Sequence, residues 1–329
     1  MKTLVTGGAG FIGSHLVERL VRDGHQVTVL DNLCTGREEN LAGVKRGVTL
    51  HKVDIADPPA IKPLFKGMDW VFHLAALADV VPSIVRPGDY YHSNVSGTFA
   101  VLEASRAHQV KKVGYTASSS CYGLPDSIPT PETAEIRCMY PYALTKYLGE
   151  ELLLHWGKVY KIPVISLRLF NVFGPRSRTS GTYGAVFGVF LAQKLAGVPF
   201  TVVGNGKQSR DFTFVTDIAD AYVKAAESNE SGEVMNVGTG KPQTINRLVE
   251  LLGGSVTNLP KRPGEPDCTQ AETSKIRQKL GLTPKVSFEE GVSIMLKNID
   301  FWKTAPVWNP DSIAEATRDW FRFLGGEKT

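Results

Sequence analysis

The chain has 329 residues, of which 42% are hydrophobic and 21% charged, and its formal net charge is +4 at pH 7. This composition is typical of a packed globular protein and excludes a largely disordered chain. The positive charge is dispersed along the chain, so it does not form the basic stripe of a nucleic-acid-binding protein. The length favours one large domain with a smaller partner domain.

The cysteines and histidines do not suggest a metal site. The four cysteines contain no C-x-x-C pair, and the seven histidines do not cluster, so we expect neither a metal nor a redox centre. Scattered thiols are typical of a reducing compartment. The chain begins with a predicted strand in place of a signal peptide, and it has no apolar run long enough to span a bilayer. We therefore expect a cytoplasmic protein without a membrane or nucleic-acid partner.

Strands and helices are predicted to alternate in the first half of the chain. The predicted strands are 2–6, 26–30, 48–53, 70–74, 113–117 and 164–169. Helices are predicted from Ile12 to Gly24, over about 94–108 and over 142–156. This alternation favours an α/β fold with a doubly wound parallel sheet and helices on both faces.

The pattern becomes less regular after Gly174. Helices are predicted at 185–196, 217–227, 243–252, 288–302 and 310–323, and short strands near Phe200, Phe212 and Met235. We predict that residues 1–174 form a nucleotide-binding domain, to whose sheet a segment near 212–240 returns. Residues 175–329 are expected to form mainly a smaller α+β domain that binds substrate.

A glycine-rich loop joins the first strand to the first helix. Gly7, Gly10 and Gly13 allow the backbone to turn tightly and to approach a diphosphate at the helix N-terminus. Asp31 ends the second strand, where a carboxylate accepts hydrogen bonds from an adenosine ribose and repels a 2′-phosphate. The loop and Asp31 therefore predict NAD in preference to NADP. The alternative interpretation is that the glycines form a structural turn without a ligand and that the aspartate is incidental. Asp54, which ends the third predicted strand, is a candidate for the adenine or a turn residue.

A tyrosine and a lysine lie four residues apart, at Tyr142 and Lys146, on one face of a predicted helix. A nearby ammonium and a nicotinamide cation lower the pKa of a phenol, which is about 10 when unperturbed, so that it can act as a base near neutral pH. Ser118, Ser119 and Ser120 follow the strand at 113–117, and active sites lie at that end of such strands. Taken alone, the pair also fits a solvated helix face, and the serines fit a polar turn.

Together these motifs resemble those of the extended short-chain dehydrogenases/reductases, the NAD-dependent nucleotide-sugar epimerases and dehydratases, and among them most the UDP-GlcNAc and UDP-glucose 4-epimerases. The matching stretches are TGGAGFIGSH at 6–15, DN at 31–32, HLAA at 73–76, NVSGT at 94–98, SSSCYG at 118–123, YALTK at 142–146, RLFNVFGPR at 168–176, RDFTFVTD at 210–217, NVGTG at 236–240 and RPGEP at 262–266. They cover nearly the whole chain and, as a set, are more specific for the family than for one reaction. The resemblance implies a Rossmann fold.

The resemblance also implies roles for individual residues. Ser118, Tyr142 and Lys146 would be catalytic. The implied NAD-binding residues are Gly7, Gly10, Phe11, Ile12, Gly13, Asp31, Asn32, Asp54, Ile55, Leu74, Ala75, Ala76, Asn94, Tyr142 and Lys146. The implied substrate-binding residues are Ser119, Ser120, Asn171, Arg210, Arg262, Glu265 and Thr269. The two arginines would clamp the sugar diphosphate, because a guanidinium binds phosphate oxygens in pairs.

The two residues after Ser118 help to distinguish between the reactions of the family. The 4,6-dehydratases of the family usually carry Asp-Glu at this place, and the decarboxylases commonly keep the glutamate. Ser119 and Ser120 stand there in this chain, and neither can act as an acid or base near pH 7. We therefore predict a UDP-sugar 4-epimerase that works through a transient 4-keto sugar.

The sugar is predicted from Thr269. In the resembling 4-epimerases a bulky tyrosine at this place narrows the pocket, so threonine leaves room for a 2-acetamido group. UDP-GlcNAc and UDP-GalNAc are the preferred pair, with UDP-glucose and UDP-galactose as a second.

Two other activities stay open. One is a dehydratase or decarboxylase that recruits an acid such as Glu132, Glu135 or Asp79, and the other is a non-catalytic protein that binds NAD or a nucleotide sugar. The resemblance further implies a homodimer formed through helices within 92–108 and 141–159.

Overall fold

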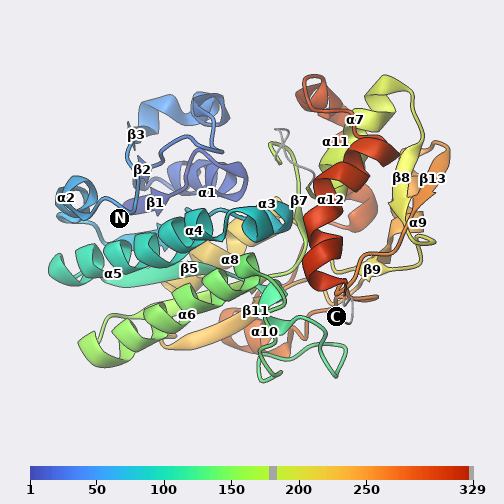
Figure 1. Cartoon of the computed structure of the whole chain (residues 1–329). Coiled ribbons are helices and arrows are strands. Elements are labelled where there is room, and N and C mark those ends of the chain that lie inside the picture. The colour runs from blue at the N-terminus through green and yellow to red at the C-terminus, as the bar shows by residue number, and fades with distance from the viewer. Residues whose placement is uncertain (178–183, 326–329) are drawn as a thin grey trace.

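The computed structural model describes residues 1–177 and 184–325. Seven strands form one parallel sheet in the order β11-β6-β5-β4-β1-β2-β3 (Figure 1). Their bounds are β1 (Lys2–Thr6), β2 (Gln26–Leu30), β3 (Val48–His51), β4 (Trp70–His73), β5 (Lys112–Ser118), β6 (Val164–Leu169) and β11 (Glu233–Val237). The chain winds outward from β1 to β3 and then returns to β4 on the other side of β1. The predicted doubly wound Rossmann fold is therefore confirmed.

The strand register brings the loops that follow β1, β2 and β4 to one edge of the sheet. Thr6 at the end of β1 pairs with Leu30 at the end of β2 and with His73 at the end of β4. The chain leaves β1 and β4 toward opposite sides, which is the place where ligands bind in sheets of this kind.

Helices cover both faces of the sheet. On one face, α1 (Phe11–Arg22) packs against α8 (Val215–Glu227), and α10 (Ser274–Leu280) packs against α8 and β11. On the other face, α5 (Gly97–Ala107) and α6 (Pro141–Tyr160) pack against each other. Because both faces are covered, the inner strands are largely buried, and all six residues of β6 are buried, including Ser166 and Arg168.

Short elements connect these layers. They are η1 (Glu38–Gly47), α2 (Pro58–Ile61), η2 (Lys62–Phe65), α3 (Val80–Val85), α4 (Pro87–Tyr90), the π-helical turn η3 (Tyr91–Ser96) and η4 (Ser119–Tyr122). The helix predicted to begin near residue 94 therefore begins earlier, in η3, and runs directly into α5.

The rest of the chain forms small sheets and helices around an aromatic core. Its strands are β7 (Val172–Phe173), β8 (Phe200–Val203), β9 (Ser209–Arg210), β10 (Thr213–Phe214), β12 (Gln243–Thr244) and β13 (Val256–Leu259). They pair as β7 with β10, β9 with β12 and β8 with β13. The helices are α7 (Val186–Ala196), α9 (Ile245–Leu252), α11 (Phe288–Lys297), η5 (Ile299–Trp302) and α12 (Pro310–Leu324). Phe173 and Phe187 stack within this core with ring centroids 4.7 Å apart.

Most predicted elements are confirmed within a few residues, and the strands at 2–6, 26–30 and 164–169 have the predicted bounds. The single helix predicted over 288–302 is wrong, because the chain turns between α11 and η5 at Asn298, whose side chain donates to the carbonyl of Ile294 (2.9 Å). The division of the chain near residue 174 remains a proposal. Among the described residues, no helix has the length and apolarity needed to cross a membrane.

Candidate active site

The loop between β1 and α1 is as tight as its glycines suggest. Gly7 has a φ of +70°, and its amide donates to the carbonyl of Leu30 (2.8 Å). A Cβ on Gly7 would lie 2.7 Å from the amide nitrogen of Ala75, so a side chain would collide with the loop after β4. Gly10 caps α1 without a side-chain hydrogen bond, which leaves the first amides of the helix available to an anion.

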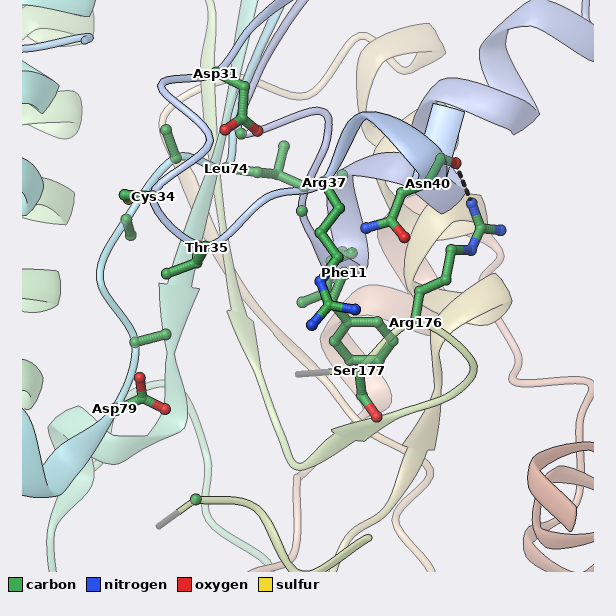
Figure 2. A pocket seen from close by; sticks show the side chains of 18 of the residues that line it. Phe11, Asp31, Cys34, Thr35, Arg37, Asn40, Leu74, Asp79, Arg176 and Ser177 are labelled. Carbon is green, nitrogen blue, oxygen red and sulfur yellow. Dashed lines mark hydrogen bonds between the residues drawn. The ribbon is translucent and has the colours of Figure 1, made fainter. Parts of the chain in front are cut away.

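A cavity of about 340 Å³ lies along this edge of the sheet (Figure 2). Twelve of the residues predicted to bind the cofactor line it, namely Gly7, Gly10, Phe11, Ile12, Gly13, Asp31, Asn32, Asp54, Ile55, Leu74, Ala75 and Ala76. Asn94, Tyr142 and Lys146 are not part of this lining. The first twelve residues therefore share one cavity, which has the glycine turn and the helix N-terminus that a dinucleotide diphosphate requires.

Asp31 fits a ribose at the end of this cavity. Its two carboxylate oxygens accept hydrogen bonds from the amides of Ala9 (2.9 Å) and Leu33 (2.8 Å). Burial raises the pKa of this carboxyl, and these two hydrogen bonds oppose the rise. Since a carboxylate offers about four acceptor sites, Asp31 retains acceptors for ribose hydroxyls.

Asp54 is a turn residue that also reaches the first cavity. It accepts hydrogen bonds from the Asn32 amide group (3.0 Å) and from the backbone of Ala56 (2.8 Å), so it shapes the turn after β3. It also lines the cavity.

Asn94 fastens the loop after β4 to α6. Its side-chain nitrogen donates to the carbonyl of Leu77 (3.0 Å) and to the hydroxyl of Thr145 (3.1 Å), and its oxygen accepts from the amide of Leu77 (2.8 Å). Both amide hydrogens are thus engaged with the protein.

Ser118, Tyr142 and Lys146 come together at the carboxyl end of β5. Ser118 is the last residue of β5, and Tyr142 and Lys146 lie in the first two turns of α6. The hydroxyl of Ser118 lies 2.8 Å from that of Ser120. Burial raises the pKa of the Tyr142 phenol, while a hydrogen bond with Ser118 lowers it.

The expected lowering of the Tyr142 pKa by Lys146 is not what the chain alone produces. Lys146 is buried, and its Nζ lies 4.4 Å from the ring centroid of Tyr115. Burial lowers the pKa of Lys146 to about 7, against the opposing charge of Glu150. Lys146 is therefore only partly an ammonium near neutral pH. At Tyr142 the effect of burial on the pKa is the largest one, and it raises the pKa.

A buried ion pair supports α6 one turn beyond Lys146. Glu150 accepts from the guanidinium of Arg168 on β6 (2.5 Å) and from the hydroxyl of Ser166 (2.7 Å). The same guanidinium donates to the hydroxyl of Tyr122 (2.9 Å). These partners satisfy the buried carboxylate of Glu150, which lies one helical turn from Lys146.

A second cavity of about 310 Å³ lies in the smaller part of the chain. It is lined by Val203, Gly204, Asn205, Lys207, Gln208, Arg210, Lys261, Glu265, Pro266 and Asp267. Arg210 pairs with Glu265 at 2.9 Å, and Arg262 lies 3.9 Å from the other oxygen of the same carboxylate. The two arginines predicted to clamp a diphosphate therefore flank a single carboxylate.

Thr269 contacts Asn171. Its hydroxyl donates to the Asn171 side-chain oxygen (2.8 Å) and accepts from the amide of Asp211 (3.2 Å). Thr269 is half-buried, so it is not a residue that merely faces solvent.

Several residues that line the two cavities were not predicted from the sequence. In the first these include Arg37, Asn40, Arg176 and a C-terminal group of Phe301, Ala305, Pro306 and Trp308. Figure 2 shows Arg37 beside Phe11 and Arg176 reaching the backbone of Asn40, a hydrogen bond of 2.8 Å. Arg176 lay within a quoted motif. The C-terminal group carries no motif, so nothing in the sequence pointed to it.

Known proteins resemble this chain over most of its length. A family model described as the NAD dependent epimerase/dehydratase family matches residues 3–238. A UDP-glucose 4-epimerase from Mycolicibacterium smegmatis is 36% identical over 314 residues, which cover 92% of this chain and 99% of that protein.

Solved structures of similar proteins have the same fold. A UDP-N-acetylglucosamine 4-epimerase from Methanobrevibacter ruminantium, in complex with UDP-N-acetylmuramic acid, has a TM-score of 0.86 at 36% identity and covers 91% of this chain and 98% of its own. A UDP-glucose 4-epimerase from Thermus thermophilus, in complex with NAD, has a TM-score of 0.83 at 35% identity and covers 91% and 99%.

Replacing Lys146 by methionine is expected to change how stability depends on pH. The pKa of Lys146 is about 7 in the folded chain against 10.5 ordinarily, so between these values the unfolded chain binds more protons. The free energy of unfolding of the wild type should therefore rise with pH in this window relative to Lys146→Met, by at most about 1.4 kcal/mol per pH unit. Urea denaturation of cofactor-free protein at two pH values within the window measures this, with Lys158→Met, an exposed site on α6, as control. Parallel pH profiles for the wild type and Lys146→Met would contradict the assignment.

Proposed function

This chain belongs to the NAD dependent epimerase/dehydratase family, and from that premise we propose that it inverts carbon 4 of a UDP-linked sugar. UDP-GlcNAc and UDP-GalNAc are the preferred pair, and UDP-glucose and UDP-galactose are the second. The observation that carries the proposal is the meeting of Ser118, Tyr142 and Lys146 at the carboxyl end of β5, with no carboxylate at positions 119 and 120.

NAD is the cofactor of this enzyme family, and when bound it accepts a hydride from carbon 4 and returns it. Tyr142 removes the proton of the C4 hydroxyl, and Ser118 hydrogen-bonds the same oxygen. The protonated fraction of Lys146, together with the positive charge of a bound nicotinamide, would stabilise the phenolate of Tyr142. Loss of the hydride and the proton leaves a 4-keto sugar.

The substrate must then turn over before the hydride returns. Arg210 and Arg262 hold the diphosphate, with Glu265 between them as a fixed partner. Asn171 lies beside Thr269 and faces the same substrate. A sugar held through its diphosphate is free to rotate about that linkage, so it presents its other face and the hydride returns with inversion.

The surroundings of Ser118 disfavour elimination. Ser120 shares a hydrogen bond with Ser118. Glu135 pairs with Arg137 at the surface (2.6 Å), and Glu132 accepts from the backbone of Asn236 (2.8 Å). Of the three acids considered as substitutes, only Asp79 lines the first cavity. Epimerisation needs none of them.

NMR at the sugar carbons tests the reaction. NAD-loaded enzyme is incubated with UDP-, dTDP-, GDP- and CDP-sugars, and UDP-GlcNAc should give a mixture with UDP-GalNAc. Tyr142→Phe should lower the rate by a factor of roughly 10² to 10⁴, the usual contribution of general acid–base catalysis. A stable 4-keto-6-deoxy product would establish a dehydratase instead. A folded, NAD-loaded wild type that converts no sugar would establish a binding protein.

Thr269→Tyr tests the sugar preference. The larger ring should exclude a 2-acetamido group and lower kcat/KM for UDP-GlcNAc on the order of tenfold relative to UDP-glucose, as steric changes of this size do. Thr269→Val keeps the size and loses the hydrogen bond to Asn171, so it separates volume from polarity. Equal effects of Thr269→Tyr on both sugars would sink the assignment.

A homodimer through α5 and α6 is part of the proposal. These helices lie side by side (Figure 1) and carry exposed apolar side chains, among them Phe99, 45% exposed, and Leu144, 47% exposed. Burying such a patch against a second copy removes apolar surface from water.

Sedimentation measures the expected mass, twice 35.9 kDa. Phe99→Asp should shift the protein to the monomer because it places a charge within the patch, while Leu124→Asp, an equally exposed site elsewhere, should not. A monomeric wild type would exclude this arrangement.

A further inference from the structure

The C-terminal helix α12 packs across the molecule against α3, which follows the loop after β4 (Figure 1). It begins at a capping box formed by Asn309 and Ser312. Ile313, Thr317 and Trp320 are buried along one face, at the spacing of successive helical turns. The helix lies beyond residue 238, where the family match ends, so membership of the family gives it no role.

Trp320 fixes the far end of α12 in place. Its side chain is 7% exposed, and its Nε1 donates to the carbonyl of Pro263 (2.9 Å). The guanidinium carbon of Arg262 lies 5.6 Å from the centroid of its ring, a cation–π arrangement. On another side, its ring centroid lies 6.1 Å from that of Tyr140.

These contacts connect Trp320 to both halves of the proposed reaction site. Arg262 shares Glu265 with Arg210. Tyr140 lies nearly parallel to Tyr142, with ring centroids 6.4 Å apart and an interplanar angle of 5°. The indole therefore lies between the diphosphate clamp and the phenol proposed to act as the base.

We propose that Trp320 is a positioning residue, and that α12 forms a wall of the sugar diphosphate site. Trp320 holds Arg262 in the orientation that receives a phosphate, and it supports Tyr140 behind Tyr142. The identity of the ligand rests on the proposed function, whereas the contacts of Trp320 do not.

The position of Arg262 under the indole is the physical reason why Trp320 matters for the diphosphate site. Arg210 lies 2.9 Å from this carboxylate, but Arg262 lies 3.9 Å from it and under the indole. Without the aromatic face, the guanidinium of Arg262 loses a contact that fixes its orientation beside Glu265. A guanidinium binds phosphate oxygens in pairs only when its plane is suitably oriented, so loss of the ring should weaken the diphosphate site.

Calorimetry with UDP tests this in three variants of the full-length, NAD-loaded protein. Trp320→Leu keeps a buried apolar side chain but removes the ring, and the Kd of UDP should rise about tenfold, within the range of a desolvated cation–π contact. Trp320→Phe keeps a ring and loses the N–H bond to Pro263, and the Kd should rise about threefold. Phe323→Leu, on the same helix with a side chain 60% exposed, should bind UDP as the wild type does.

Kinetics distinguish positioning from a general loss of structure. In Trp320→Leu the KM for the UDP-sugar should rise with the Kd of UDP, while NAD content and melting temperature should stay close to those of Trp320→Phe. If Trp320→Leu does not fold, the threefold effect in Trp320→Phe decides. Wild-type affinity for UDP in every folded Trp320 variant would overturn the proposal.

The outcome for the wild type separates this proposal from the proposed function. A wild type that binds UDP but epimerises no UDP-sugar refutes the reaction, and the three variants still decide on Trp320. A wild type that does not bind UDP refutes both.

Discussion

The site depends on how closely the loops after β1 and β4 approach each other. At Gly7 the separation leaves no room for a side chain, since a Cβ would lie 2.7 Å from the amide of Ala75. The hydroxyl of Thr6 accepts from the amides of Leu74 (3.2 Å) and Ala75 (3.1 Å), and a hydrogen bond of 2.7 Å links it to the His73 ring. These contacts hold the two loops together before they diverge, and the first cavity opens where they do.

The first half of the fold could be predicted because its signals are local. The stretch 164–169 is rich in branched apolar residues and is bounded by loop residues, and the glycines at 7, 10 and 13 mark a turn between a strand and a helix. The second half depends on contacts between distant segments. Residues 256–259 form a strand by pairing with residues 200–203, and only the fold supplies that partner. The short helix α10 was missed for the same reason, since it lies on α8 and β11.

The sequence predicted which residues meet in the site better than it predicted their pKa values. Spacing alone places Tyr142 and Lys146 on one helical face, but burial is a property of the whole molecule. Burial lowers the pKa of Lys146 and raises that of Tyr142, which reverses the expectation drawn from the pair in isolation. The ion pair of Glu150 with Arg168 could not be inferred either, because it joins a helix to a strand 18 residues later.

The C-terminal group of Phe301, Ala305, Pro306 and Trp308 forms part of the wall of the first cavity, where Phe301 lies 5.6 Å from the guanidinium of Arg37. This wall combines a segment near residue 37 with one near residue 301, so it is complete only when both segments have folded. A ligand that fills the first cavity therefore stabilises both segments at once, because the complete wall exists only in the folded chain.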